Sequence, residues 1–120
     1  MKRYKVTVTT DASGNATAYT PRLSGLADAI HYVKGDFADG VDFTITSEAT
    51  GVSLWTDTNV NASEVVRPRA PTHDQAGAAL LYASGGTAVS ERIALANDRV
   101  KIVIAQGGNA KSGTFHILVD

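Results

Sequence analysis

The residues best suited to chemistry in this sequence are three histidines and a loop rich in aspartate. His31, His73 and His116 are far apart in the chain, and none has a cysteine or second histidine at the short spacing of a metal site. The loop 36–42 contains three aspartates, but their order does not match the D-x-D-x-D-G pattern of an EF-hand calcium loop. We therefore predict no metal site.

The segment 107–112, G-G-N-A-K-S, is similar in composition to a phosphate-binding loop. The pattern G-x-x-x-x-G-K-S requires glycine at two positions where this chain has Ala105 and Ala110. The segment also joins two expected strands, so the helix N-terminus that binds phosphate is missing. No G-x-S-x-G nucleophile elbow occurs, and no acidic pair stands out from ordinary surface carboxylates. The sequence predicts no catalytic residue, no cofactor and no enzymatic activity.

The composition is that of one globular domain, residues 1–120, with few charges. Hydrophobic residues make up 43% of the chain, charged residues only 19%, and the net charge is −1. The low charged fraction indicates that a partner covers part of the surface. There is no basic run for nucleic acid, and no apolar stretch of the ~18 residues that a membrane span needs. The chain has no cysteine, and its basic start lacks the apolar segment of a signal peptide.

Alternation of apolar and other residues predicts strands along almost the whole chain, most clearly over residues 99–120. Two apolar runs there flank a glycine-rich turn, with Val100, Ile102 and Ile104 in the first and Phe115, Ile117 and Val119 in the second. A period of two places each trio on one face of a strand. Val103 and Leu118 make the other face apolar too, so we expect a central hairpin.

Two more hairpins are expected from the same alternation. Residues 4–9 and 16–20 would form the first, and Pro21 confines its second strand to a sheet edge or an exit. Residues 41–46 and 52–57 would form the other around a turn that ends in glycine.

Segment 23–33 fits either a helix or a strand, because both periods place apolar residues on one face. Gly25 and the β-preferring end Ile30–Val33 favour a strand. A helix is otherwise possible only within residues 75–82, since the apolar run 78–83 is short. We therefore predict an all-β fold, an antiparallel, jelly-roll-like β-sandwich of about eight short strands.

Trp55 and the polar, extended segment 58–73 are candidates for contact with a partner. Trp55 is either a core residue of a two-sided sheet or an interface anchor, because Trp and Arg dominate interface energetics. The arginines of segment 58–73 flank a proline and belong either to ordinary surface or to a docking arm. The candidate protein-interface residues are Trp55, Arg67, Pro68, Arg69 and His73.

Four stretches that span nearly the whole chain carry a family resemblance. They are 4–20 (YKVTVTTDASGNATAYT), 39–55 with D-F-T-I-T-S-E-A-T-G, 58–73 with T-N-V-N-A-S and P-R-A-P-T-H, and 99–116 (RVKIVIAQGGNAKSGTFH). Together they resemble a family of small virion proteins of tailed bacteriophages, encoded among the head and tail genes. The last stretch is the most distinctive.

The resemblance implies a non-enzymatic structural protein, first of all a head decoration (cement) protein and alternatively a head–tail connector or tail component. The expected partner is the major capsid protein, and the expected location is the capsid surface, after assembly in the host bacterial cytoplasm. A small symmetric homo-oligomer is expected, with a trimer favoured because cement sites lie near local symmetry axes. An alternative from another class is a carbohydrate-binding module, with a site formed by Trp55, Tyr32 and loop 36–42.

Overall fold

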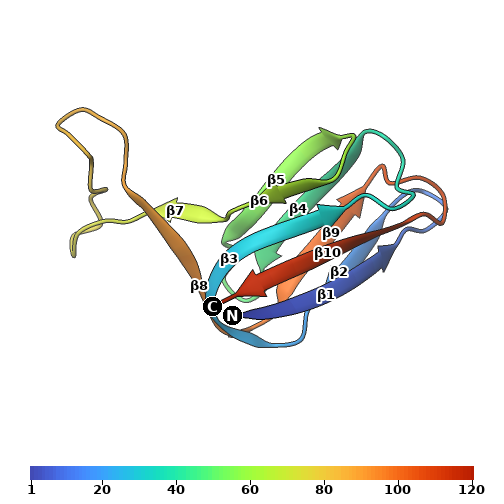
Figure 1. Ribbon diagram of the computed structural model, residues 1–120, viewed down its shortest axis with the longest axis horizontal. Helices are drawn as coiled ribbons and strands as arrows, with labels where there is room; N and C mark the ends of the chain where they lie inside the picture. The colour runs from blue at the N-terminus through green and yellow to red at the C-terminus, as the bar shows by residue number, and fades with distance from the viewer.

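The computed structural model describes the whole chain, residues 1–120, as ten strands in two antiparallel sheets that pack face to face (Figure 1). The strands are β1 (Lys2–Thr9), β2 (Ala16–Tyr19), β3 (Leu23–Val33), β4 (Val41–Ser47), β5 (Ser53–Val60), β6 (Glu64–Val66), β7 (Arg69–Pro71), β8 (Ser90–Asp98), β9 (Val100–Ala105) and β10 (Ser112–Val119). The six-stranded sheet has the order β1-β10-β3-β8-β7, with β6 also paired to β3, and the four-stranded sheet has the order β2-β9-β4-β5. The predicted all-β sandwich is confirmed.

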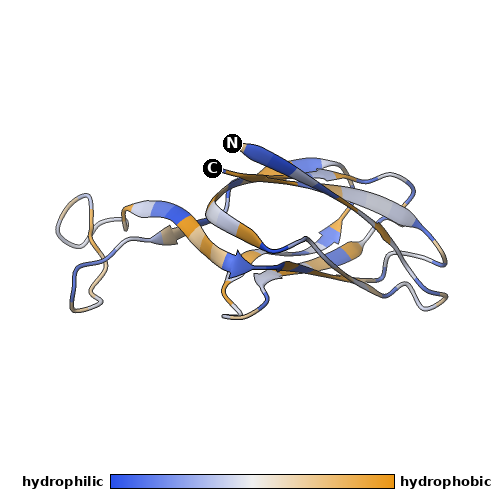
Figure 2. Cartoon of the chain, turned by 90° about the horizontal axis from the view of Figure 1, so that it is seen from below, coloured by the Kyte–Doolittle hydropathy of each residue, from blue (hydrophilic) through white to orange (hydrophobic).

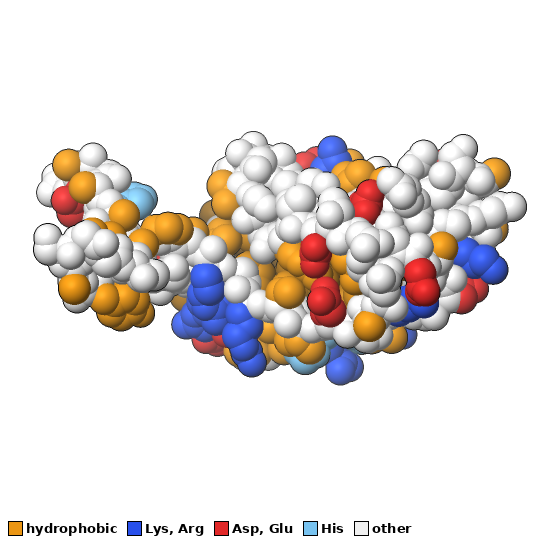
Figure 3. Space-filling view, turned by 90° about the horizontal axis from the view of Figure 1, so that it is seen from above, with side chains coloured by type: hydrophobic (Ala, Val, Ile, Leu, Met, Phe, Trp, Pro, Cys, Tyr) orange, Lys and Arg blue, Asp and Glu red, His pale blue; other side chains and the backbone are white.

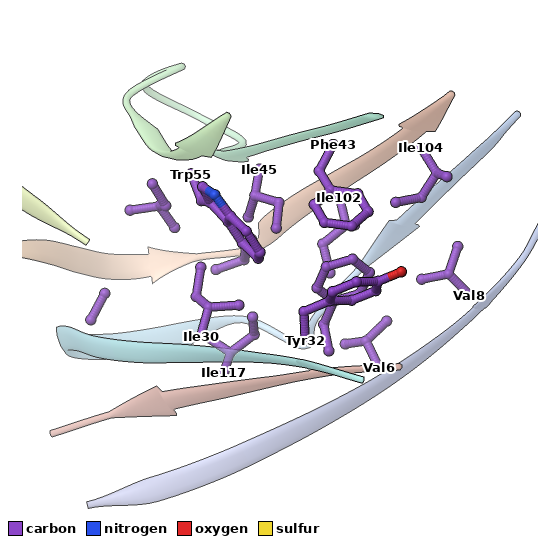
Figure 4. Packing of buried hydrophobic residues seen from close by; sticks show 14 of the residues in the cluster. Val6, Val8, Ile30, Tyr32, Phe43, Ile45, Trp55, Ile102, Ile104 and Ile117 are labelled. Carbon is purple, nitrogen blue, oxygen red and sulfur yellow. The ribbon is translucent and has the colours of Figure 1, made fainter. Parts of the chain in front are cut away.

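The hairpin predicted over residues 99–120 is wrong in its pairing, although both strands form and both are central. β9 lies between β2 and β4, whereas β10 lies between β1 and β3 in the other sheet. The turn between them crosses the sandwich, so the two apolar rows face each other across the interior (Figure 4). Alternation identifies the buried face of a strand, and that face is the same in a hairpin and in a crossing between sheets.

The predicted opening hairpin is wrong for the same reason. β1 pairs with β10 and β2 pairs with β9, so the chain between them also crosses the sandwich. Thr10 joins the two crossings: its hydroxyl donates a hydrogen bond to the Gly108 carbonyl and accepts one from the Lys111 amide. The Gly107 amide donates to the Gly14 carbonyl at 3.0 Å. β2 is an edge strand, as Pro21 indicated.

The other expectations for secondary structure are confirmed. β4 and β5 form the predicted hairpin, and residues 75–82 contain no helix. Segment 23–33 is a single strand, β3, rather than a helix. Its Gly25 has a φ of 135°, and a side chain there would collide with the carbonyl oxygen of Asp120. Glycine is therefore needed where β3 begins to pair with its neighbours.

Aromatic rings from both sheets meet in the centre of the core (Figure 4). Tyr32 and Phe115 come from the six-stranded sheet, and Phe43 and Trp55 from the four-stranded one. The Phe43 ring lies 4.5 Å from Tyr32 and 5.1 Å from both Trp55 and Phe115, measured between centroids, and each of these pairs packs edge to face. This geometry adds attraction beyond the burial of apolar area.

One hairpin leaves the sandwich. β7 pairs with the first residues of β8 beyond the other strands, and residues 72–89 connect them (Figures 1 and 2). We call residues 69–92 the arm and residues 72–89 the arm tip. The arm gives the molecule its long axis, 49 Å against 30 and 22 Å in the other directions.

Removing core atoms from the facing rows should destabilise the fold far more than a change in the crossing turn. We expect Ile102→Ala or Ile117→Ala, both fully buried, to lower the free energy of unfolding by about 2–5 kcal/mol through cavity formation. The side chain of Lys111 is exposed, so Lys111→Ala should cost less than ~0.5 kcal/mol. Urea denaturation of the three variants measures this, and a larger loss for Lys111→Ala would contradict the position of the turn.

Asp98 is the one acidic residue that is buried. Its carboxylate accepts hydrogen bonds from the Ser47 hydroxyl and from the amides of Ala49 and Arg99. These bonds, the Ser47 hydroxyl foremost, hold the pKa of Asp98 below its usual range. They attach the β4–β5 turn to the start of β9.

The lowered pKa of Asp98 predicts acid sensitivity. Its contribution to stability is complete above the unfolded-state pKa of about 3.9 and is lost as the pH falls through the lower pKa of the folded state. In Asp98→Asn this contribution is absent at every pH. Denaturation midpoints between pH 7 and pH 2.5 should therefore fall less steeply below pH 4 in Asp98→Asn than in the wild type. Parallel curves would show that Asp98 does not carry the acid sensitivity.

Candidate functional site

A cluster of arginines around Asp28 anchors the arm to the sandwich. The Asp28 carboxylate lies 3.2 Å from Arg67 and 3.7 Å from both Arg69 and Arg92. Arg69 also donates to the Asp28 backbone carbonyl at 3.1 Å, and Arg92 pairs with Asp120 at 2.9 Å. The Asp28 side chain is only 17% exposed, so these ion pairs are less screened by solvent than typical surface pairs. They fix where the arm leaves the body.

The docking arm predicted for segment 58–73 has different boundaries in the structure. Its first residues complete β5, its middle forms β6 against β3, and only its end enters the arm. Arg67 and Arg69 both pair with Asp28, although the Arg67 side chain is 62% exposed. Pro68 is buried, and His73 is exposed at the start of the arm tip. The prediction is wrong in its boundaries because the sequence does not show which strands pair with this segment.

Trp55 is a core residue, which was one of its two predicted roles. Its side chain is 9% exposed and packs against Phe43 and Tyr32. A register shift between Ile45 and Thr46 in the β4–β5 pair leaves Leu54 and Trp55 both buried. Tyr32 is 1% exposed, so the carbohydrate site predicted from these two aromatic residues does not form at the surface.

The three histidines do not converge. His31 and His116 are paired neighbours on β3 and β10, whereas His73 lies on the arm. Burial, together with the charges of Arg3 and Lys5, lowers the pKa of His116. No group of three or more histidine, aspartate or glutamate side chains is placed to hold a metal ion.

The aspartates of loop 36–42 act singly rather than as a cluster. Asp36 accepts a hydrogen bond from the Ser112 amide at 2.6 Å, and Asp39 pairs with Lys34 at 2.6 Å. These contacts attach the loop to β10 and to the end of β3. The arrangement is that of a structural loop.

The largest hollow lies at the base of the arm and has a volume of about 490 Å³. Its lining residues are Leu26, Ala70, Pro71, His73, Glu91, Arg92, Ile93 and Ala94. They include no serine or threonine hydroxyl that His73 could activate as a nucleophile.

The arm tip has an ordered backbone but no interior of its own. Residues 73–87 are all exposed. Their backbone is nevertheless bonded internally: the Leu80 amide donates to Thr72 at 3.1 Å and the Val89 amide to Leu80 at 2.8 Å. The Asp74 carboxylate accepts from two following amides and closes a turn.

The side chains of the arm tip are nearly uncharged and partly apolar. Asp74 is the only aspartate, glutamate, lysine or arginine between residues 72 and 89. Leu80, Leu81 and Tyr82 are 47, 44 and 76% exposed, and hydrophobic side chains spread over this end of the molecule (Figure 3). Exposed apolar surface of this kind marks sites of protein contact. We therefore identify the arm tip as the candidate functional site.

The sequence contains a signal for the arm tip, but the same signal is typical of a buried strand. The run 78–83 is apolar and its surroundings lack charge, which is equally typical of a short buried strand. Only the departure of the β7–β8 hairpin from the sandwich shows that this run is exposed.

Comparison with known proteins gives no family for this chain: no protein-family model matches it, and no curated protein matches its sequence. The structure contains no helix long and apolar enough to cross a membrane.

Proposed function

We propose that this protein is a non-enzymatic structural component of a tailed-bacteriophage virion, a head decoration (cement) protein that binds the major capsid protein. The observation that carries the proposal is the arm tip, an ordered and almost uncharged element that exposes Leu80, Leu81 and Tyr82 away from the body. Exposed apolar surface of this kind marks sites of contact with other molecules, protein partners among them. The sequence resemblance to phage virion proteins supports the choice of partner.

The size of the arm tip suits a protein interface. It contains roughly 18 residues, close to the 20–30 residues that one partner contributes to a standard interface. Aromatic residues such as Tyr82 are enriched in interface cores, whereas charged residues are depleted there. On a lattice the same contact is repeated many times, so each copy needs only moderate affinity.

The anchor at Asp28 supports the same role. Arg69 and Arg92 of the arm, and Arg67 just before it, all pair with the largely buried carboxylate of Asp28. An arm held in a defined direction loses less conformational freedom on binding than a free loop would, and this improves affinity. The rigid sandwich then positions the arm.

The small net charge of −1 argues that binding to the capsid depends on packed apolar contacts rather than on long-range attraction. Salt screens long-range attraction but leaves packed contacts largely intact. We propose a small symmetric oligomer, with a trimer favoured, on the capsid surface after assembly in the host bacterial cytoplasm. Attachment at the connector or tail is the alternative, because the arm tip would serve equally well there.

Co-sedimentation with expanded capsids that contain only protein tests the proposal. The wild type should bind with a saturating, fixed ratio to the major capsid protein, in moderate salt as well as in low salt. Leu81→Ser should weaken binding at least tenfold, about 1.4 kcal/mol, with an unchanged thermal midpoint, because it removes apolar contact without touching the core. Val52→Ser is the matched control, since Val52 is also 44% exposed but lies in the β4–β5 turn.

Three outcomes would contradict parts of the proposal. Equal binding by Leu81→Ser and the wild type would remove the arm tip as the docking element. Attachment of the wild type to purified tails or portals, but not to capsids, would establish the connector or tail alternative. Binding to none of these particles would overturn the assignment to the virion.

A further inference from the structure

The two lateral sides of the sandwich carry charges of opposite sign. One side is formed by the edge strands β1 and β2, and the other by β5 and β6 (Figure 1). The first side, which we call the basic side, has the cations Lys2 and Arg22 beside a hollow, and Arg3 and Lys5 on the outer face of its edge strand β1. The second, which we call the acidic side, has the carboxylates Asp57 and Glu64.

The cations of the basic side have no ion-pair partner within the chain. Lys2 and Arg22 line a hollow of about 350 Å³ together with Met1 and Tyr4. Asp120 lines the same hollow, but its carboxylate pairs with Arg92 at 2.9 Å and lies 3.9 Å from the N-terminal amine. Positive charge therefore remains available to an outside carboxylate.

The carboxylates of the acidic side lie at the lateral edge of the sandwich, beside the gap between its two sheets. Asp57 is paired with Phe43 and Glu64 with Tyr32 in the strand registers. Both partners point into the core, so both carboxylates lie along the gap between the sheets rather than on an outer face. Neither makes an ion pair. Figure 3 looks onto this side and shows acidic side chains grouped beside hydrophobic surface.

Apolar surface and hollows accompany the charges on both sides. On the acidic side Val33 and Val65 are 45 and 55% exposed and line a hollow of about 310 Å³ with Glu64. On the basic side Met1 is 68% exposed, and Tyr4 is half-buried. Each side thus has a hollow and exposed apolar side chains, and the two sides differ in the sign of their charge.

Each side also ends in a free strand of equal length. β1 and β5 have eight residues each and stand at the edges of their sheets. A free edge presents unpaired backbone groups that can bond to another strand. Lysines on an edge normally prevent such pairing, but an acidic edge on a second copy converts the repulsion into attraction.

We infer that copies of this chain associate head to tail, with the basic side of one copy against the acidic side of the next. Because the two surfaces lie on opposite sides of one molecule, the contact is heterologous and produces a ring or an open chain of copies. The inference does not rest on the proposed capsid partner. It uses surfaces other than the arm tip, which remains uncovered in such an assembly.

Charge reversal with rescue tests this contact on the purified protein alone. One variant carries Lys2→Glu and Arg22→Glu, and the other carries Asp57→Lys and Glu64→Lys. In sedimentation velocity at low salt the wild type should form oligomers that dissociate as salt is added. Each variant alone should associate at least tenfold more weakly, because like charges then meet at the contact.

An equimolar mixture of the two variants should recover association, because each then offers the charge that the other lacks. Recovery in the mixture cannot arise from misfolded chains. A control variant with Lys111→Glu reverses a charge of the same kind in the far turn, and it should associate as the wild type does. A monomeric wild type, a mixture without recovery, or an equal loss in the control would each overturn the inference. Association without any capsid binding would leave it standing and refute only the proposed function.

Discussion

The packing of β9 against β10 across the interior is the contact on which the other elements depend. Each of these strands is an interior strand of its own sheet: β9 lies between β2 and β4, and β10 lies between β1 and β3. The bonds of Thr10 and Gly107 keep the two crossings together at one end of the sandwich. The arm begins where β8 stops pairing with β3: β8 pairs with β3 from Ile93 onward, whereas residues 90–92 pair only with β7.

The sequence allowed the strands and their buried faces to be predicted, but not their partners. The alternation around Ile102 and Ile117 correctly identified both as core residues, since a period of two depends only on which face is covered. It could not distinguish a hairpin from a crossing between sheets, because both bury the same side chains. Trp55 illustrates a second limit: a register shift in the β4–β5 pair interrupts strict alternation, and sequence alone does not locate such shifts.

The candidate site was accessible to sequence reasoning only in part. Arg67 and Arg69 were recognised as unusual, and in the structure both pair with Asp28 at the base of the arm. The arm tip was visible only as the short apolar run 78–83, because exposure is a tertiary property that composition does not reveal. The division of charge between the two sides of the sandwich depends on strand order in the same way.

The central claim is that the arm tip is covered by another protein in the functional assembly. Hydrogen exchange of the amides in residues 72–89 tests it most directly, comparing the free protein with the protein bound to expanded capsids. In the free protein these amides should exchange rapidly, since no core covers them. Binding should slow their exchange at least tenfold while β9 and β10 change little. Unchanged exchange in the arm tip of capsid-bound protein would contradict the claim.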